Sequence, residues 1–208
     1  MITVGSLFTG YGGLDQAVHA VLGGRLAWVS DIDPGANALL AHRYPDVPNL
    51  GDVSTVDWSQ VEPVDVLAGG FPCTDVSSAG RRAGLHAGTR SGLWIQMARA
   101  IDALNPPMVV IENVRGLCSA PAHSELEPCA WCVGDDEGVP LRALGAVLGD
   151  LADLGYDARW CGLRAADVGA PHGRYRVFIV AFPCGGAGGG GGRPPAGAGG
   201  ARRGAARR

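Results

Sequence analysis

Short apolar runs rich in β-branched residues alternate along this chain with amphipathic segments. Near-continuous Val, Ile and Leu runs are typical of parallel strands that are buried on both faces, and helical connections then cover the sheet. We therefore predict an α/β fold with a doubly wound, mostly parallel sheet. The five predicted strands are MITVGSLF (1–8), RLAWVSDI (25–32), VDVLAGGF (64–71), PMVVIENV (107–114) and YRVFIVAF (175–182).

The clearest predicted helix covers residues 139–156, VPLRALGAVLGDLADLGY. Its leucines recur at spacings of three and four, which places them on one face of a helix. Gly155 is a plausible C-cap. The leucines of this stripe are Leu141, Leu144, Leu148, Leu151 and Leu154.

Length and composition predict one domain, residues 1–184, followed by a tail. The 208 residues suffice for one domain with a sizeable core. Residues 185–208 contain only Gly, Ala, Pro and Arg, so we expect them to be disordered. The net charge is -3, and it becomes -8 when the five tail arginines are left out. A domain this acidic is no general polyanion binder, and any nucleic-acid contact requires a local patch or another part.

We also expect a soluble, cytoplasmic protein. No apolar run approaches the roughly 18 residues of a membrane span, and the N-terminus lacks the features of a signal peptide. The six cysteines are then expected to be reduced.

Glycines and carboxylates gather where predicted strands end. Gly10, Gly12 and Gly13 follow the first strand and open a helix. Such glycines let a ligand approach the backbone, and a carboxylate after the next strand accepts hydrogen bonds from ribose hydroxyls. This pattern favours a nucleoside-like cofactor over a dinucleotide, although a plain glycine turn remains an alternative. The carboxylates follow the second strand and a third strand region at 49–58: Asp31, Asp33 and Asp52.

A second group of polar residues suggests covalent catalysis. Cys73 lies on a loop just past one predicted strand, and Glu112 lies at the end of the next. A thiolate and a carboxyl group together suit nucleophilic catalysis with proton transfer. Arg174 and Arg176 alternate into the last strand, where two guanidinium groups on one face orient a carbonyl or phosphate and lower a thiol pKa.

In this order, these motifs closely resemble the DNA (cytosine-5) methyltransferase family over residues 2–182. The motifs are Phe8-x-Gly10-x-Gly12-Gly13, Asp31 with Asp33, Gly51-Asp52-Val53, Pro72-Cys73, Glu112-Asn113-Val114 and Arg174-x-Arg176. The resemblance implies a Rossmann-like methyltransferase fold, S-adenosylmethionine as cofactor, and a prokaryotic or phage origin. The cofactor positions that it implies are Phe8, Gly10, Gly12, Gly13, Asp31, Ile32, Asp52, Val53 and Leu93.

The resemblance also implies a mechanism. Cys73 attacks C6 of cytosine, Glu112 hydrogen-bonds N3 and the exocyclic amine, and C5 then accepts the methyl group before Cys73 is eliminated. The cytosine must leave the DNA double helix to reach these groups. The catalytic group implied by the resemblance is Cys73, Glu112, Arg174, Arg176, Pro72 and Asn113.

The chain departs from the family pattern in several places. Thr74 and His172 stand where the family commonly has Gln. A target-recognition region and the C-terminal segment that completes the cofactor pocket are replaced by the tail, which suggests a truncated or frameshifted chain. Two further hypotheses stay open: a cytosine-5 methyltransferase for RNA, and an inactive module or half-enzyme whose second chain carries target recognition.

Residues 117–138 form a predicted insertion rich in Cys and His. Three cysteines and a histidine suit a structural zinc ion, although loop thiols without a metal are the alternative. The candidate ligands are Cys118, His123, Cys129 and Cys132.

Overall fold

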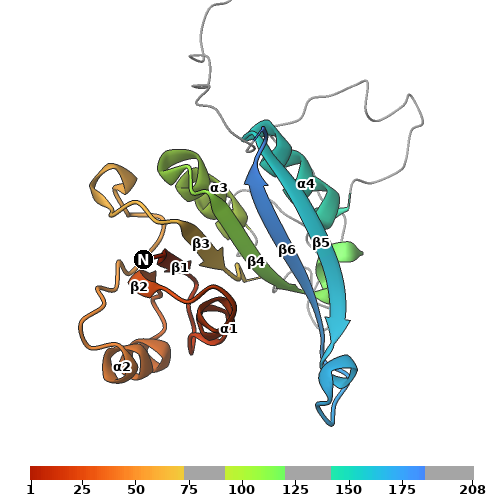
Figure 1. Cartoon of the computed structure of the whole chain (residues 1–208), viewed down its shortest axis with the longest axis horizontal. Helices are drawn as coiled ribbons and strands as arrows, with labels where there is room; N and C mark the ends of the chain where they lie inside the picture. Colours follow the sequence, from red (N-terminus) through yellow and green to blue (C-terminus); the bar gives the residue numbers. More distant parts are fainter. Residues whose placement is uncertain (73–91, 120–141, 186–208) are drawn as a thin grey trace, which may run out of the picture.

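The strands form where the apolar runs predict them, with one addition. The computed structural model of the chain describes residues 1–72, 92–119 and 142–185. A six-stranded sheet runs through these segments in the order β2-β1-β3-β4-β6-β5 (Figure 1). The strands are β1 (Thr3–Leu7), β2 (Arg25–Ser30), β3 (Val66–Gly69), β4 (Met108–Val114), β5 (Tyr156–Arg164) and β6 (Tyr175–Pro183).

The sheet is mostly parallel, as predicted. Strands β2, β1, β3 and β4 run parallel to one another, whereas β6 lies antiparallel between β4 and β5. Strand β5 was not predicted, because this edge strand is largely exposed and carries no continuous apolar run. The third strand region at 49–58 is reduced to one parallel bridge between Val29 and Asn49.

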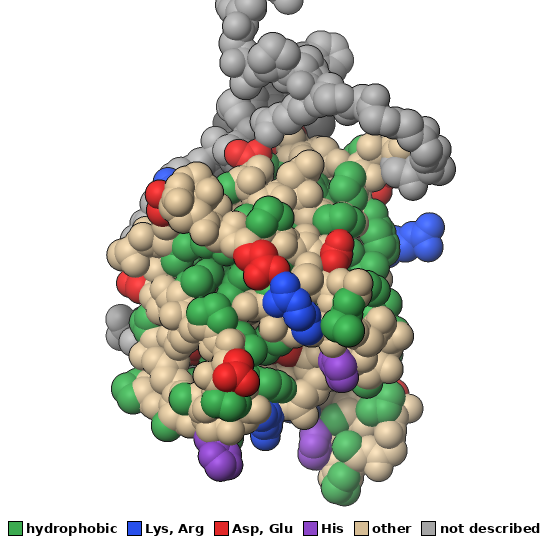
Figure 2. All heavy atoms as spheres, turned by 60° about the vertical axis from the view of Figure 1, so that its left-hand side comes forward, with side chains coloured by type: hydrophobic (Ala, Val, Ile, Leu, Met, Phe, Trp, Pro, Cys, Tyr) green, Lys and Arg blue, Asp and Glu red, His purple; other side chains and the backbone are tan. Residues whose placement is uncertain are grey.

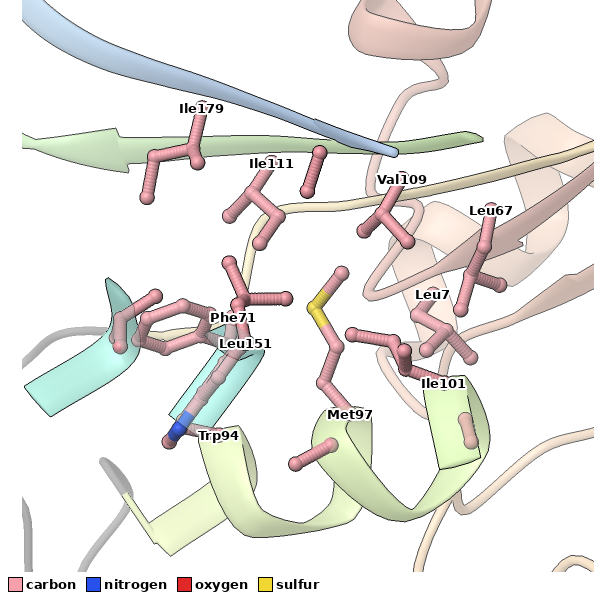
Figure 3. Packing of buried hydrophobic residues seen from close by; sticks show 14 of the residues in the cluster. Leu7, Leu67, Phe71, Trp94, Met97, Ile101, Val109, Ile111, Leu151 and Ile179 are labelled. Carbon is pink, nitrogen blue, oxygen red and sulfur yellow. The ribbon is translucent and has the colours of Figure 1, made fainter. Parts of the chain in front are cut away.

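Helices cover both faces of the sheet, which confirms the doubly wound architecture. On one face, α3 and α4 pack with β3, β4 and β6 in the larger apolar cluster (Figure 3). On the other face, α1 packs on β1 and β3 through Val18, Val4 and Val66. The helices are α1 (Gly13–Leu22), α2 (Pro34–Arg43), α3 (Leu93–Leu104) and α4 (Ala143–Asp153), with short 3-10 turns η1 (Trp58–Gln60), η3 (Arg115–Cys118) and η4 (Ala165–Val168).

The predicted leucine helix is present as α4, although it is shorter than residues 139–156. Leu144 and Leu151 are buried, and Leu148 and Leu154 pack against the same core. Gly155 follows the helix with φ 82, and its N–H donates to the carbonyl of Ala152 at 2.9 Å, so it ends the helix as predicted. Leu141 lies outside the described residues.

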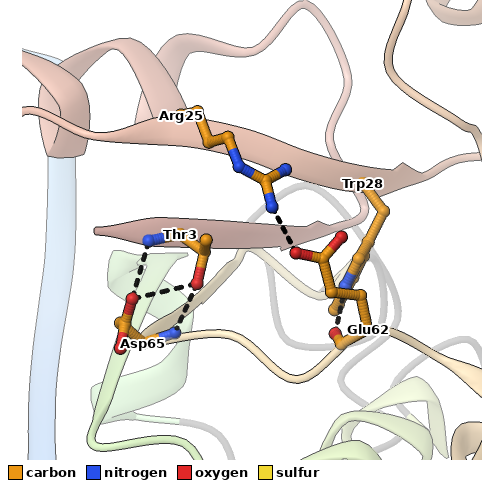
Figure 4. Close-up of polar contacts among 5 residues, drawn as sticks. All are labelled: Thr3, Arg25, Trp28, Glu62 and Asp65. Carbon is orange, nitrogen blue, oxygen red and sulfur yellow. Dashed lines mark hydrogen bonds and ion pairs between the residues drawn. The ribbon is translucent and has the colours of Figure 1, made fainter. Parts of the chain in front are cut away.

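Polar contacts hold the amino ends of the first strands together (Figure 4). The backbone N–H and hydroxyl of Thr3 donate to Asp65 Oδ2 at 2.8 and 2.9 Å. The Trp28 indole donates to the carbonyl of Glu62 at 2.9 Å, and Glu62 pairs with Arg25. These contacts join β1 and β2 to the segment that leads into β3.

The described surface shows mixed charge. Acidic and basic side chains are interspersed among uncharged ones over the described part of the face in Figure 2, without a continuous basic patch there. Among the helices of the described segments, none has both the length and the apolar character needed to cross a membrane.

Candidate active site

The candidate site residues converge because four parallel strands end at one edge of the sheet. Leu7 pairs with Ser30 and with Gly69, and Gly69 pairs with Ile111. The segments that follow these positions therefore begin side by side along the carboxyl edge. Ligands of open α/β sheets bind at this edge.

The glycine turn after β1 is built from left-handed backbone. Gly10 and Gly12 have φ 56 and φ 78, and Phe8 adopts φ 53 although it is not a glycine. A Cβ added at Gly10 would meet no atom within 4 Å, so backbone conformation rather than space favours glycine there. The turn ends at Gly12, directly before α1, whose first N–H groups point toward the carboxyl edge.

Asp31 holds this turn against the end of β2. Its Oδ2 accepts the N–H of Gly10 at 2.7 Å, and its Oδ1 accepts the N–H of Asp33 at 2.8 Å. Each carboxylate oxygen keeps further acceptor capacity, which a ribose hydroxyl can use. Asp33 has another task, because its side chain caps α2 through the N–H of Ala36 at 2.8 Å.

Asn49 is a residue of this edge that the sequence reasoning missed. Its Oδ1 accepts the N–H groups of Asp31 and Gly51 at 3.1 and 3.0 Å, and its Nδ2 donates to the carbonyl of Asp31 at 3.2 Å. One amide thus fixes both the Asp31 and the Gly51 segments. The available signal was an Asn two residues before a turn glycine, since Asn side chains commonly bond backbone two residues further on.

The remaining predicted cofactor positions combine charge with apolar surface. Ser54 donates to Asp52 Oδ1 through its N–H and its hydroxyl at 2.9 and 2.7 Å, and these bonds lower the pKa of Asp52. Ile32 leaves 67% of its surface exposed, whereas Val53 is buried and Leu93 is half-buried at the start of α3. A carboxylate, an exposed apolar side chain and a glycine turn thus line one stretch of the edge.

Glu112 and Arg176 pair across β4 and β6. The guanidinium Nε of Arg176 contacts Glu112 Oε1, and both side chains are partly buried. Burial raises the pKa of Glu112, and the positive charge of Arg174 partly offsets that rise. Arg174 itself precedes β6 by one residue rather than lying within the strand.

Gly70 leaves room for this carboxylate. A Cβ added at Gly70 would lie 3.1 Å from Glu112 Oε2, so a side chain there would crowd the acid. Next to it, the buried Asn113 side chain donates from Nδ2 to the carbonyl of Phe71 at 3.1 Å. The exit of β3 and the end of β4 are therefore held together directly before Pro72.

A comparison with protein-family models identifies the family of the chain. The family model described as C-5 cytosine-specific DNA methylase matches residues 2–185. The chain belongs to this family.

Relatives among the C-5 cytosine-specific DNA methylases support this assignment. The type II methyltransferase M.MspI of Moraxella sp is 31% identical over 176 residues, which cover 85% of this chain and 37% of the relative. M.NlaIV of Neisseria lactamica is 33% identical over 155 residues, covering 74% of this chain and 34% of the relative. The chain thus spans well under half the length of these two relatives.

Solved structures share the fold. A putative DNA modification methyltransferase encoded within a prophage of E. coli aligns with TM-score 0.62 and 22% identity, over 88% of this chain and 47% of that one. The Dnmt2 methyltransferase of S. pombe aligns with TM-score 0.63 and 18% identity, over 88% of this chain and 49% of that one. At these identities, the likeness concerns the fold of the family.

Several predicted site residues lie outside the described residues. These include Cys73, the predicted nucleophile of this methylase, and three of the four predicted zinc ligands, His123, Cys129 and Cys132. Cys118 is half-buried at the end of η3, and burial raises the pKa of its thiol. The described segments contain no group of three potential metal ligands. The zinc site stays a prediction.

Proposed function

We propose that this domain is the catalytic part of a DNA (cytosine-5) methyltransferase that uses S-adenosylmethionine. The observation that carries the proposal is Glu112, a partly buried acid with a raised pKa that pairs with Arg176 at the carboxyl edge. Perturbed acids at the ligand edge of an α/β sheet are typical of catalytic sites. Family membership supplies the reaction class.

The cofactor fits the residues at the other end of this edge. When bound, S-adenosylmethionine supplies an electrophilic methyl group. The carboxylate of Asp31 would accept hydrogen bonds from ribose hydroxyls, and the exposed side chain of Ile32 would cover an apolar face of the adenine. The open space beside Gly10 and Gly51 leaves their backbone accessible to a ligand.

The protein residues would carry out the rest of the reaction. The Cys73 thiolate forms a bond to C6 of a flipped cytosine, while Glu112 hydrogen-bonds N3 and the exocyclic amine and so stabilises the electron-rich ring. C5 then takes the methyl group, a base removes the C5 proton, and the bond to Cys73 breaks. Flipping the base costs a few kcal/mol. Arg174 and Arg176 would hold the pyrimidine O2 and the flanking phosphate.

We further propose that target recognition resides outside these residues. The described surface in Figure 2 has no continuous basic patch, and the chain covers 34% of M.NlaIV and 37% of M.MspI. A second polypeptide that carries target recognition is one source of the contacts that would read the DNA sequence. The bacterial origin of these relatives supports a cytoplasmic location, because bacterial DNA lies in the cytoplasm.

A covalent trap tests the proposal. The chain is incubated with S-adenosylmethionine and DNA that contains 5-fluorocytosine, and the products are analysed by mass spectrometry. Fluorine at C5 blocks elimination, so an adduct should persist on Cys73 and disappear in Cys73→Ser. The matched control is Cys161→Ser, because Cys161 is an exposed cysteine on β5, far along the chain from the motif. If no adduct formed, the proposal that this chain is active without another part would be wrong.

A further inference from the structure

Asn49 lies where the chain returns from α2 to the edge strand β2, at one end of the sheet (Figure 1). The N–H of Val29 donates to the carbonyl of Pro48 at 3.0 Å, and the N–H of Leu50 donates to the carbonyl of Val29 at 2.8 Å. These bonds form the parallel bridge that joins Val29 to Asn49. The bridge fixes the backbone of Asn49 beside β2, close to the residues that follow this strand.

All four hydrogen-bonding positions of the Asn49 amide are used within the chain. Its Oδ1 accepts the N–H groups of Asp31 and Gly51 at 3.1 and 3.0 Å. Its Nδ2 donates to the carbonyl of Asp31 at 3.2 Å and to Asn37 Oδ1 at 2.8 Å. A carboxamide offers two lone pairs on its oxygen and two N–H donors, so none is left for a ligand. Asn49 therefore serves the site by holding other groups in place.

The groups that Asn49 holds come from three segments of the chain. Asp31, after β2, is bonded at both its N–H and its carbonyl, and Asn37 ties the amide to α2. Gly51 is bonded at its N–H by Asn49, while its carbonyl accepts the Ser30 hydroxyl at 2.8 Å. Gly51 has φ 73, and a glycine turn is permissive unless such bonds restrict it. Asp31 and Gly51 both belong to the proposed nucleoside end of the carboxyl edge.

We propose that Asn49 is a positioning residue for the nucleoside part of S-adenosylmethionine. It acts through Asp31 and Gly51, without a hydrogen bond of its own to the cofactor. This inference rests on the proposed function, because it takes S-adenosylmethionine as the ligand of this edge. A site that is already ordered binds more tightly, since less conformational freedom is lost on binding.

Cofactor binding to Asn49→Ala tests the proposal. The variant loses all four bonds of the amide, so the Kd for S-adenosylmethionine, measured by calorimetric titration, should rise by about 3-fold to 10-fold. Glu112 lies on β4, three strands away from β2 in the sheet. The rate of 5-fluorocytosine adduct formation at saturating S-adenosylmethionine should therefore stay as it is. An unchanged Kd would overturn the positioning role.

A double-mutant cycle separates positioning from a general loss of stability. If Asn49 acts through Asp31, Asn49→Ala should raise the Kd by a smaller factor in an Asp31→Ala background than in the parent chain. Equal factors in the two backgrounds would contradict the proposal.

Asn105→Ala is the matched control. Asn105 follows α3 with φ 44, and its Oδ1 accepts the hydroxyl of Tyr156 at 3.4 Å, so it too is an asparagine with a structural task. It precedes β4 and thus lies toward the amino edge. Its replacement should lower Tm and leave the Kd unchanged in both backgrounds. A rise in Kd equal to that of Asn49→Ala would mean that lost stability alone explains the effect.

A measurement without cofactor decides the inference even if the chain alone binds no S-adenosylmethionine. Hydrogen exchange at the backbone amides of Asp31 and Gly51 is followed by NMR. Both amides donate to Asn49 Oδ1, so Asn49→Ala should speed their exchange severalfold, whereas Asn105→Ala should not. Unchanged exchange in Asn49→Ala would overturn the positioning role. A parent chain that binds no S-adenosylmethionine would overturn only the proposed function.

Discussion

Two glutamate–arginine pairs lie at opposite edges of the same sheet. Glu62 pairs with Arg25 at the amino edge, where the side chains are 48% and 49% exposed. Glu112 pairs with Arg176 at the carboxyl edge, where they are 32% and 20% exposed. Exposed ion pairs contribute about 0–1 kcal/mol to stability. Burial raises the pKa of Glu112 toward neutral pH, and an acid whose pKa is near the working pH transfers protons more effectively.

The difference in exposure shows that the same two residue types have different properties at the two edges of the sheet. At the amino edge, Thr3 donates hydrogen bonds to Asp65, and these bonds lower the pKa of the Asp65 carboxyl group. The carboxyl edge instead holds Glu112, an acid that is partly desolvated. Substitutions of the same type at the two edges should therefore separate activity from stability.

The largest effect is expected for Glu112→Gln. The amide cannot exchange a proton with the cytosine ring, so the rate of 5-fluorocytosine adduct formation should fall by about 10²–10⁴-fold. Single-turnover measurements by mass spectrometry give this rate. The Kd for S-adenosylmethionine should stay the same, because the cofactor is expected at the Asp31 end of the edge.

Glu62→Gln is the matched control at the amino edge. It removes the same charge from a glutamate–arginine pair and should leave the adduct rate as it is. Equal losses of rate in the two variants would contradict the division of roles between the edges.

A smaller effect is expected for Asp31→Ala. The variant loses the acceptor for the N–H of Gly10 and the proposed acceptor for the ribose hydroxyls. Hydrogen bonds to a charged group contribute about 1.5–3 kcal/mol, so the Kd for S-adenosylmethionine should rise by about tenfold or more. Calorimetric titration measures it. Asp65→Ala, which removes a carboxylate that bonds Thr3, should lower Tm without changing this Kd.

The smallest effect is expected for Asp15→Asn, and it concerns stability alone. Asp15 lies in the first turn of α1, is 5% exposed, and its Oδ1 has no hydrogen-bond partner among the described residues. Burial raises the pKa of Asp15 above its ordinary value of 3.8. The folded protein therefore binds this proton more tightly than the unfolded chain does, and stability falls as the pH rises through the interval between the two pKa values.

At neutral pH, Asp15→Asn should raise the free energy of unfolding by about 1 kcal/mol, since the amide carries no charge to desolvate. The gain should vanish below the ordinary pKa, where the parent residue is protonated in both states. Urea unfolding at acidic and neutral pH measures this difference. Asp46→Asn, at an exposed position, should show no such pH dependence. A gain that persists unchanged in acid would refute the burial argument.

The sequence by itself determined the layered α/β fold, the strand order along the chain and the residue types at the strand ends. Apolar runs and helical periodicity act over a few neighbouring residues, so the pattern revealed β1 to β4, β6 and α4. Gly10, Asp31 and Glu112 were visible for the same reason, because each directly follows or ends an apolar run.

Only the tertiary structure decided which distant residues meet. The exposed edge strand β5 carries no local signal, since its stability comes from pairing with β6. The pair of Glu112 and Arg176 depends on the antiparallel register of β4 and β6, and the bond of Trp94 to Asp150 depends on how α3 and α4 pack. Periodicity predicts which face of an element is buried, but contacts between elements are set by the packing of the whole sheet and its helices.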